Sequence, residues 1–494
     1  MATAQTSSGV RDRNELYIAG SWVQPSGDGY IEVPNPATEE VVARVPRPEI
    51  ADADRALAAA RKAFDEGPWP RMSIRERAEI LSELAELVER RLDDFTHTFS
   101  IESGAPLALS RGFAQSPVLS LRDTTALAER VELEVERANS EARVKVVQEP
   151  VGVVLSIAPW NGPISLAALK LVPALLAGCT VVHKPSEEVP LVTYLLADLI
   201  DELGLPEGVV SIVPGGREFG EHMVRHPAVD KVTFTGSTAA GRRIMSVCGE
   251  RITRVSLELG GKSPAIIADD VEMADVASSL TWACIMHSGQ VCCAITRALV
   301  PEQRHDELVE ALVEEMKAVQ VGDPLDPETQ LGPLTMARQR DRVESYFELA
   351  RQEGATIACG GRRPPHLDRG YYVEPTVLAN VENSMRVARE EIFGPVLCVI
   401  PYKDIDDAIR IANDSDYGLA GAVYTHDPVL GEQIARRVRT GQISISGYGT
   451  CVTHPFGGYK QSGIGREGGM DGLGLFLETK VINYTPALPI AGAA

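Results

Sequence analysis

Several features are missing from this sequence, and each absence excludes a class of protein. No run of about eighteen or more apolar residues occurs, so we expect no membrane span. The eight cysteines form no C-x-x-C pair and no Cys/His cluster with zinc spacing, so no structural metal is expected. Positive charge is also scarce, with 48 Lys and Arg against 69 Asp and Glu, a net charge of −21. Such a surface repels phosphate backbones, which makes nucleic acid an unsuitable partner.

The beginning of the chain lacks the marks of a targeting segment. Met1 to Val10 is small and polar, and the acidic Asp12 and Glu15 follow soon after. We therefore expect a cytoplasmic protein with a frayed N-terminus. Seven of the cysteines are expected to be small buried hydrophobic residues in a reducing compartment, with Cys292 set apart below.

The composition is that of an ordinary globular protein. Hydrophobic residues make up 44% of the 494 residues and charged residues 24%. At roughly 100–200 residues per domain, this length predicts two to four domains. We find no internal sequence repeat.

The first 150 residues are mostly helical in pattern. Residues 51–66 read as a helix, and Ser73 with Glu76 forms a capping box before the next helix. A third helical pattern runs from about 109 to 130. Residues 142–149 then alternate in polarity and predict a strand.

From residue 151 onward, strand and helix patterns alternate. Such β-α-β repetition predicts a parallel, doubly wound sheet, in which ligands bind beyond the carboxyl ends of the strands. Asn161, Lys184, Gly236 and Glu258 all fall at predicted strand ends. The predicted strands are 151–159, 180–185, 209–215, 231–236 and 254–261, with helices over 164–178 and 192–204 and one opened by Ser237.

A second α/β series follows residue 261. Its predicted strands are 296–301, 371–378, 395–402, 420–425 and 442–446, with helices near 304–319, 404–413 and 428–438. No low-complexity linker separates the two halves. The fold class is therefore α/β, with two doubly wound parallel-sheet domains packed face to face and a cleft between them.

Cys292 and Glu258 are the most reactive candidates. Cys292 lies in SGQVCCAITR, where Gly289 and Gln290 predict an irregular turn before a strand. A single cysteine is more often structural than catalytic. Glu258 is a carboxylate in an otherwise apolar strand followed by Gly-Gly, so it either caps a helix or acts as a general base with a raised pKa.

Two further segments fit a phosphate-bearing ligand and an oxyanion. FTGSTAAG places Gly236 and Gly241 around a strand-to-helix turn, where Ser237 could donate to a diphosphate, although the spacing alone is a weak signal. Trp160 and Asn161 end another strand. The Asn161 amide either donates to an oxyanion or forms a helix cap, and the segment alone favours the cap.

Polar groups at two other strand ends suit ribose recognition. Lys184 and Glu187 in HKPSE can each bond a ribose hydroxyl, and EEIFGP supplies Glu391 and Phe393 from the second half. Taken singly, these residues are equally consistent with solvated charge pairs.

Together the segments form a known pattern. From about Leu16 to Tyr484 the chain resembles the aldehyde dehydrogenase superfamily, in the branch that uses NAD+ or NADP+ and hydrolyses its acyl-enzyme. The resemblance is carried by PWN, KPSE, FTGST, LELGGKSP, GQVCC, EEIFGP and PFGGYKQSGIGRE, in the family's order.

The resemblance implies a role for each matching residue. Cys292 would be the nucleophile that forms a thioester, Glu258 the base that activates water, and Asn161 the oxyanion donor, with Lys170 and Glu467 as a relay behind the base. NAD+, with NADP+ as an alternative, would be the cofactor, and no metal is implied. The implied cofactor-binding residues are Ile157, Trp160, Lys184, Ser186, Glu187, Gly215, Gly236, Ser237, Leu259, Glu391 and Phe393.

The resemblance also implies a domain plan. Residues 1–130 and 150–260 would form a Rossmann-like cofactor domain and residues 261–477 a catalytic domain. Residues 131–149 and 478–494 would form a β-hairpin arm for oligomerisation. Family members are commonly homodimers or homotetramers, which we expect here.

Some positions depart from the family's pattern and concern the substrate. Gly162 and Leu169 stand where many members carry aromatic rings, Val291 precedes the nucleophile, and Tyr448 lies in an unusual loop. We expect a wide apolar channel for a medium-to-large hydrophobic aldehyde. The alternatives are a semialdehyde or CoA-acylating dehydrogenase, or a non-enzymatic protein on the same scaffold. Glu258 argues against CoA acylation, and the presence of Cys292, Glu258 and Asn161 argues against loss of activity.

Overall fold

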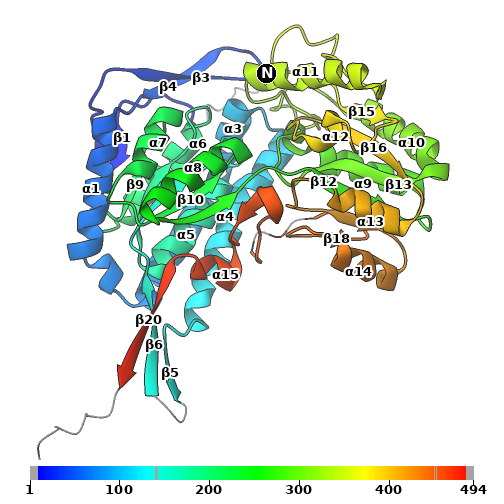
Figure 1. The fold of residues 1–494 in the computed structure, drawn as a ribbon. Coiled ribbons are helices and arrows are strands. Elements are labelled where there is room, and N and C mark those ends of the chain that lie inside the picture. The colour runs from blue at the N-terminus through cyan, green and yellow to red at the C-terminus, as the bar shows by residue number, and fades with distance from the viewer. Residues whose placement is uncertain (1–8, 139–142, 450, 452, 485–494) are drawn as a thin grey trace, which may run out of the picture.

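The computed structural model describes residues 9–138, 143–449, 451 and 453–484. Within them the chain forms two large, mostly parallel sheets with helices around each, and a three-stranded arm that projects from the body (Figure 1). The α/β fold class with two parallel-sheet layers is therefore confirmed.

The first sheet is built around five parallel strands in the order β11-β10-β7-β8-β9. In chain order this is the arrangement 5-4-1-2-3, a doubly wound sheet whose connections change direction between β7 and β10. Three antiparallel strands, β19, β1 and β2, extend its two edges. The strands are β1 (Leu16–Ile18), β2 (Ser21–Val23), β7 (Val153–Ile157), β8 (Thr180–Lys184), β9 (Val210–Ile212), β10 (Lys231–Thr235), β11 (Arg254–Glu258) and β19 (Gly463–Ile464).

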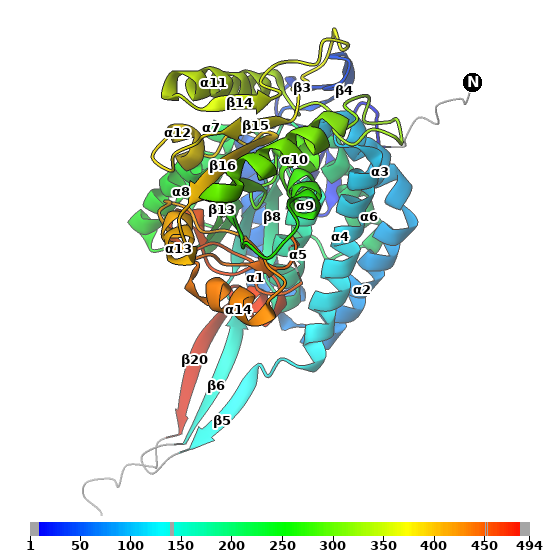
Figure 2. The same cartoon turned by 90° about the vertical axis from the view of Figure 1, so that its right-hand side faces the viewer.

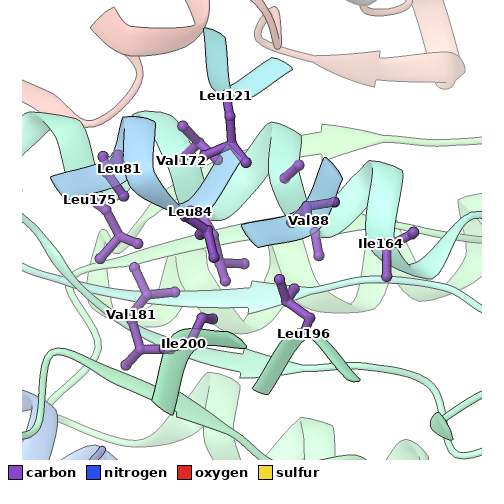
Figure 3. Packing of buried hydrophobic residues seen from close by; sticks show 14 of the residues in the cluster. Leu81, Leu84, Val88, Leu121, Ile164, Val172, Leu175, Val181, Leu196 and Ile200 are labelled. Carbon is purple, nitrogen blue, oxygen red and sulfur yellow. The ribbon is translucent and has the colours of Figure 1, made fainter. Parts of the chain in front are cut away.

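Apolar stripes on the surrounding helices form the core of this half. The capping box at Ser73 and Glu76 is present and starts α2. Leu84, Leu121, Val172 and Val181 meet in one buried cluster, in which α2, α4, α5 and α6 pack over β8 (Figure 3). The helices are α1 (Ile50–Glu66), α2 (Ile74–Arg90), α3 (Leu92–Ser103), α4 (Leu107–Ala126), α5 (Pro163–Ala177), α6 (Leu191–Leu203), α7 (Arg217–Arg225) and α8 (Thr238–Arg251).

The second sheet has the order β14-β15-β16-β13-β12-β17-β18 and is parallel except for the pair β14 and β15. Its strands are β12 (Ser263–Ile267), β13 (Ile295–Pro301), β14 (Thr356–Cys359), β15 (Thr376–Ala379), β16 (Val396–Tyr402), β17 (Ala422–Tyr424) and β18 (Ser444–Ile445). The helices in this part of the chain are α9 (Met273–Ile285), α10 (His305–Ala318), α11 (Ala337–Glu353), α12 (Arg386–Arg389), α13 (Ile405–Asn413), α14 (Pro428–Arg437) and α15 (Gly469–Gly474).

The arm consists of β5 (Glu134–Ala138), β6 (Arg143–Pro150) and β20 (Leu477–Tyr484), paired antiparallel in the order β20-β6-β5. In a view turned by 90° it still extends away from the two sheets (Figure 2). The hairpin strand β6 pairs with the C-terminal strand β20 along Arg143–Pro150, and the role of this arm in oligomerisation remains a prediction. Residues 139–142 and 485–494 of the predicted arm, and residues 1–8, lie outside the described part of the chain.

The domain boundaries inferred from the sequence remain a prediction. β19, at 463–464, pairs with β11 in the first sheet, although the sequence assigned residues 261–477 to the second unit. A two-residue edge strand carries no periodic signal, so its pairing cannot be anticipated from its sequence.

Sequence patterns missed several elements. The strongly charged helix α11 has a weak apolar stripe, and α9 is rich in small residues, so neither showed clear helical periodicity. The hairpin of β3 (Tyr30–Pro34) and β4 (Val41–Pro46) was also not anticipated, and Arg47, which follows β4, pairs with Glu187 at the site described below.

One expectation about the cysteines was wrong. Cys451 is exposed in the loop after β18, whereas the other cysteines outside Cys292 are buried. In the described residues, no helix is both long and apolar enough to cross a bilayer.

Candidate active site

The predicted site residues converge on the carboxyl ends of the first sheet's strands. Asn161 follows β7, Lys184 ends β8, Gly236 follows β10 and Glu258 ends β11. The point where the strand order reverses, between β7 and β10, is where doubly wound sheets bind their ligands.

The loop before Cys292 has an unusual backbone. His287, Ser288 and Gly289 have φ values of 48°, 55° and 73°, in the left-handed region that non-glycine residues seldom adopt. Gly289 lies against the Gly394 carbonyl with no room for a side chain. The loop is therefore held in one conformation by its neighbours, as is common at functional sites.

Hydrogen bonds of Gln290 hold this loop in place, and Asn161 bonds to the Gln290 backbone. The Asn161 Nδ2 donates to the Gln290 carbonyl oxygen at 2.8 Å. The Gln290 side chain donates to the His287 carbonyl at 2.9 Å and accepts from the Thr335 backbone N–H at 3.0 Å. An amide nitrogen carries two donors, so Asn161 retains one N–H for another acceptor beside Cys292.

Cys292 is surrounded by groups that disfavour its thiolate. A hydrogen bond with the Cys293 thiol, burial, and the nearby carboxyl groups of Glu391 and Glu258 raise the pKa of Cys292 well above its usual value. A Cβ at Gly261 would lie 2.5 Å from the Cys292 carbonyl oxygen, so the glycines after Glu258 allow the two segments to meet. The structure thus brings Cys292, Asn161 and Glu258 together.

Glu258 is buried, at 4% exposed, with incomplete hydrogen bonding. Its Oε2 has no partner within the described part of the chain. Burial, reinforced by the charge of Glu467, raises its pKa well above the usual value, and Lys170 and Arg466 only partly oppose this. A carboxyl group with a raised pKa that lacks partners is suited to proton transfer near neutral pH.

Lys170 and Glu467 form a buried ion pair behind Glu258. The Lys170 ammonium donates to Glu467 Oε1 and, at 2.7 Å, to the Thr235 hydroxyl. Glu467 Oε2 has no partner among the described residues. The predicted relay residues are therefore in contact with each other, and each of the two glutamates has an oxygen free to bond water.

A cavity of about 440 Å³ opens over the first sheet. It includes eight of the predicted cofactor-binding residues: Ile157, Trp160, Lys184, Ser186, Glu187, Gly215, Gly236 and Ser237. Ser237 is the N-cap of α8, and its hydroxyl accepts from the Ala240 N–H at 3.3 Å. The N-terminus of α8 therefore borders the cavity, where it favours a bound anion such as a diphosphate.

The polar groups at one end of the cavity are partly engaged with protein. Burial lowers the pKa of Lys184 to about 8, and its ammonium donates to the carbonyls of Gly215 and Pro185. The Ser186 hydroxyl donates to the Glu188 carboxylate, so its proton is not available to a ligand in the cavity. Glu187 lies with one oxygen over Gly216 and the other toward Arg47.

The remaining predicted cofactor residues lie toward Cys292. Glu391 Oε1 accepts from the Gly261 N–H at 3.0 Å, and burial raises its pKa to about 7. The Phe393 ring meets the Trp160 ring edge-on at 5.4 Å between centroids, so the two predicted residues contact each other from opposite halves of the chain. Leu259 packs against Gly241 of α8 and supports that helix.

Sequence reasoning missed several residues of this site. Glu188 is paired with Arg338 of α11, across the two halves, and both line the cavity. Tyr448, whose position the sequence left open, is half-buried, and its hydroxyl donates to the Cys293 carbonyl at 2.7 Å. A local motif could not reveal these pairs because their members lie far apart in the sequence.

The space beside Gly162 is narrower than the sequence predicted. A Cβ at Gly162 would lie 3.4 Å from the Phe113 ring and 3.5 Å from Leu166. Phe113 of α4 also approaches the rings of Phe99 and His287. Part of the volume that Gly162 frees is therefore filled by an aromatic ring from another helix, and the wall stays apolar.

Comparison with known proteins identifies the family. The model of the aldehyde dehydrogenase family matches residues 22–482. This chain belongs to the aldehyde dehydrogenase family.

Individual relatives cover nearly the whole chain. Geranial dehydrogenase of Castellaniella defragrans is 43% identical over 95% of this chain and 98% of its own. A Mycobacterium tuberculosis aldehyde dehydrogenase solved with NAD+ is 44% identical, with a TM-score of 0.95 over 97% of this chain and 100% of its own. A mutant of aldehyde dehydrogenase C from Pseudomonas syringae, solved with NAD+ and octanal, is 39% identical, with a TM-score of 0.92 over 95% and 96% of the two chains.

Proposed function

We propose that this protein oxidises hydrophobic aldehydes to carboxylic acids with NAD+, through a thioester on Cys292. The observation that carries the proposal is the 2.8 Å bond from Asn161 to the Gln290 carbonyl. It fixes an oxyanion donor beside the cysteine, in a loop that adjoins the cavity over the first sheet.

The cavity fits a dinucleotide in three respects. It lies at the point where the strand order reverses, the N-terminus of α8 borders it, and Lys184 and Glu187 provide ribose-binding groups at one end. Bound NAD+ would supply a hydride acceptor. Related enzymes solved with NAD+ support this assignment.

The first chemical task of the protein is to form and stabilise a tetrahedral adduct. The Cys292 sulfur, as thiolate, adds to the aldehyde carbon, and the carbonyl oxygen becomes an oxyanion. The free N–H of Asn161 Nδ2 donates to that oxyanion. Loss of hydride from the adduct then leaves a thioester on Cys292.

The second task is hydrolysis. Glu258 removes a proton from water, the water oxygen attacks the thioester carbon, and the Cys292 sulfur leaves as the acid forms. The raised pKa of Glu258 suits it to take and return a proton. Lys170 and Glu467 form the hydrogen-bonded pair behind Glu258, and the proton leaves the site along this pair.

The substrate class follows from the apolar wall. Gly162, Phe113, Leu166 and Val291 offer no charged group to a substrate carboxylate. An apolar channel gains roughly 0.8 kcal/mol for each substrate CH₂ it buries. One relative is a geranial dehydrogenase and another was solved with octanal, and both support a hydrophobic aldehyde as the substrate.

Assembly and location complete the proposal. The arm leaves Val481, Ile482 and Tyr484 largely exposed, which supports a homodimer or homotetramer formed through it. No disulfide joins the cysteines among the described residues, and a catalytic thiol needs a reducing compartment, which supports a cytoplasmic location. The acidic surface argues against a nucleic-acid partner.

The test is NADH formation, followed by its near-ultraviolet absorbance, with a panel of aldehydes and with or without CoA. The proposal expects NADH and free acid without CoA. A strict requirement for CoA would instead support an acylating dehydrogenase, and no turnover of any aldehyde would support a non-enzymatic protein.

A further inference from the structure

At the adenosine end of the cofactor cavity, the lining residue Glu187 forms an ion pair with Arg47, which lies just outside the lining and is not part of the family motifs. Arg47 Nη1 lies 3.7 Å from Glu187 Oε2. Glu187 is the carboxylate expected to bond a ribose 2′-hydroxyl and to repel a 2′-phosphate. The Glu187 carboxylate, whose charge would repel the 2′-phosphate of NADP+, is therefore paired with a positive charge.

Both members of the pair are held in place. A Cβ at Gly216 would lie 2.9 Å from Glu187 Oε1, so the carboxylate rests on the backbone that leads into α7. The backbone N–H of Arg47 donates to the Gly29 carbonyl at 2.8 Å, and its guanidinium donates to the Tyr30 carbonyl at 3.4 Å. Arg47 thus extends from the connection between β4 and α1 to the outer side of Glu187.

The guanidinium retains donors for a ligand. A guanidinium carries five N–H donors, and the Arg47 side chain is 54% exposed. The Tyr30 carbonyl and Glu187 engage only part of it, and its planar fork suits phosphate oxygens.

Two of the other arginines that line the cavity are already paired with carboxylates. Arg338 is bound to Glu188, and Arg243 lies 2.5 Å from Glu221. Arg217, at the start of α7, also lines the cavity and is the competing candidate for a phosphate contact.

We propose that Arg47 offsets the charge of Glu187 and contacts a cofactor 2′-phosphate, so that this site accepts NADP+ as well as NAD+. This inference rests on the proposed function, because it concerns the same cofactor site. Arg47 is a specificity-determining residue in this account, since it lies far from the reacting atoms.

The test measures binding apart from turnover. Isothermal titration calorimetry with ADP-ribose and with its 2′-phosphate derivative gives the ratio of the two affinities, and kcat/KM for NAD+ and NADP+ gives the matching kinetic ratio. For the wild type we expect both ligands to bind. In Arg47→Ala the affinity for the 2′-phosphate derivative, relative to that for ADP-ribose, should fall about ten-fold or more. This is the loss expected for one charge-assisted hydrogen bond.

Matched variants make the result specific. Arg44→Ala removes a neighbouring exposed arginine that pairs with Glu32 at 3.0 Å, and it should leave the ratio unchanged. Arg47→Lys keeps the charge but not the fork, so its ratio should lie between those of the wild type and Arg47→Ala. Glu187→Gln should shift the ratio toward the phosphorylated ligand.

The outcomes separate this inference from the proposed function. If the wild type binds ADP-ribose but not its 2′-phosphate, or if only Arg217→Ala lowers the ratio, Arg47 does not have this role. If neither ligand binds to the wild type, the cofactor site itself has been misassigned.

Discussion

The catalytic site and the adenosine end of the neighbouring cofactor cavity differ in how far they are buried. At the catalytic site, Asn161, Glu258 and the pair of Lys170 and Glu467 are buried, and one oxygen of each glutamate has no partner among the described residues. At the adenosine end, Glu187 and Arg47 are partly exposed to solvent. Burial holds a group in one geometry and raises the pKa of Glu258, whereas an exposed pair adapts at low cost and tunes ligand preference.

This comparison predicts that changes at the catalytic site cost far more than changes at the adenosine end. The largest loss should come from Cys292→Ser, which removes the nucleophile and should lower turnover by about 10⁴-fold or more. Cys293→Ser should keep most activity, because the neighbouring thiol has no role in bond formation. Steady-state NADH formation measures both, and the opposite pattern would exchange the two assignments.

The next largest effect should come from the oxyanion donor. Asn161→Ala removes the free N–H and also releases the Gln290 carbonyl, so kcat should fall by about 10²–10³-fold. Asn161→Asp is a matched control that keeps the shape but cannot donate, and it should be at least as damaging. Retained activity in both variants would place the oxyanion elsewhere.

Stability should separate the two regions as well. Lys170→Met leaves Glu467 buried without its partner and should lower the free energy of unfolding by about 3–5 kcal/mol. Arg47→Ala breaks an exposed pair and should cost only about 0–1 kcal/mol. Urea denaturation of the two variants measures the difference, and equal losses would contradict the comparison.

The pH dependence of turnover at mildly acidic to neutral pH should reflect Cys292 and Glu258. Cys292 and Glu258 both act in the deprotonated form, and burial and neighbouring groups raise the pKa of each. Aldehyde turnover should therefore rise from mildly acidic to alkaline pH, while binding of ADP-ribose should stay nearly constant until the Lys184 ammonium loses its proton, because burial lowers the pKa of Lys184 to about 8. Turnover that peaks at acidic pH would rule out a base with a raised pKa.

The smallest effect of a single change should be on substrate preference, where each added CH₂ raises kcat/KM by about four-fold at most. Along a series from acetaldehyde to decanal, kcat/KM should rise with chain length, because each buried CH₂ contributes roughly 0.8 kcal/mol at most. Phe113→Ala should favour the bulkiest aldehydes by opening the wall beside Gly162. A maximum at acetaldehyde or at succinic semialdehyde would contradict the apolar channel.

The same contrast explains how much the sequence could predict. The strand ends that carry Asn161, Lys184, Gly236 and Glu258 were predictable, because buried strands and alternating helices leave strong periodic signals. The residues that surround them were not. Arg338 reaches the cavity from α11, Arg47 reaches Glu187 from the connection after β4, and Phe113 reaches Gly162 from α4, through contacts that only tertiary packing creates.

The loop around Cys292 lies between these cases. Gly289 and Gln290 indicated an irregular turn, but not that His287 and Ser288 would also adopt positive φ. That conformation depends on packing against Gly394 from a distant segment. Local sequence therefore located the nucleophile, and tertiary contacts determined its orientation.

The central claim is that catalysis proceeds through a thioester on Cys292 that Glu258 resolves. Its most direct test is a single turnover of Glu258→Gln with NAD+ and octanal, followed by tandem mass spectrometry. Without its base, hydrolysis should slow by about 10²–10⁴-fold, so one equivalent of NADH should form and an octanoyl group should remain on Cys292. The exposed thiol Cys451 serves as the internal control for nonspecific acylation. Unchanged steady-state turnover, or an acyl group on Cys293 or Cys451 in place of Cys292, would contradict the account.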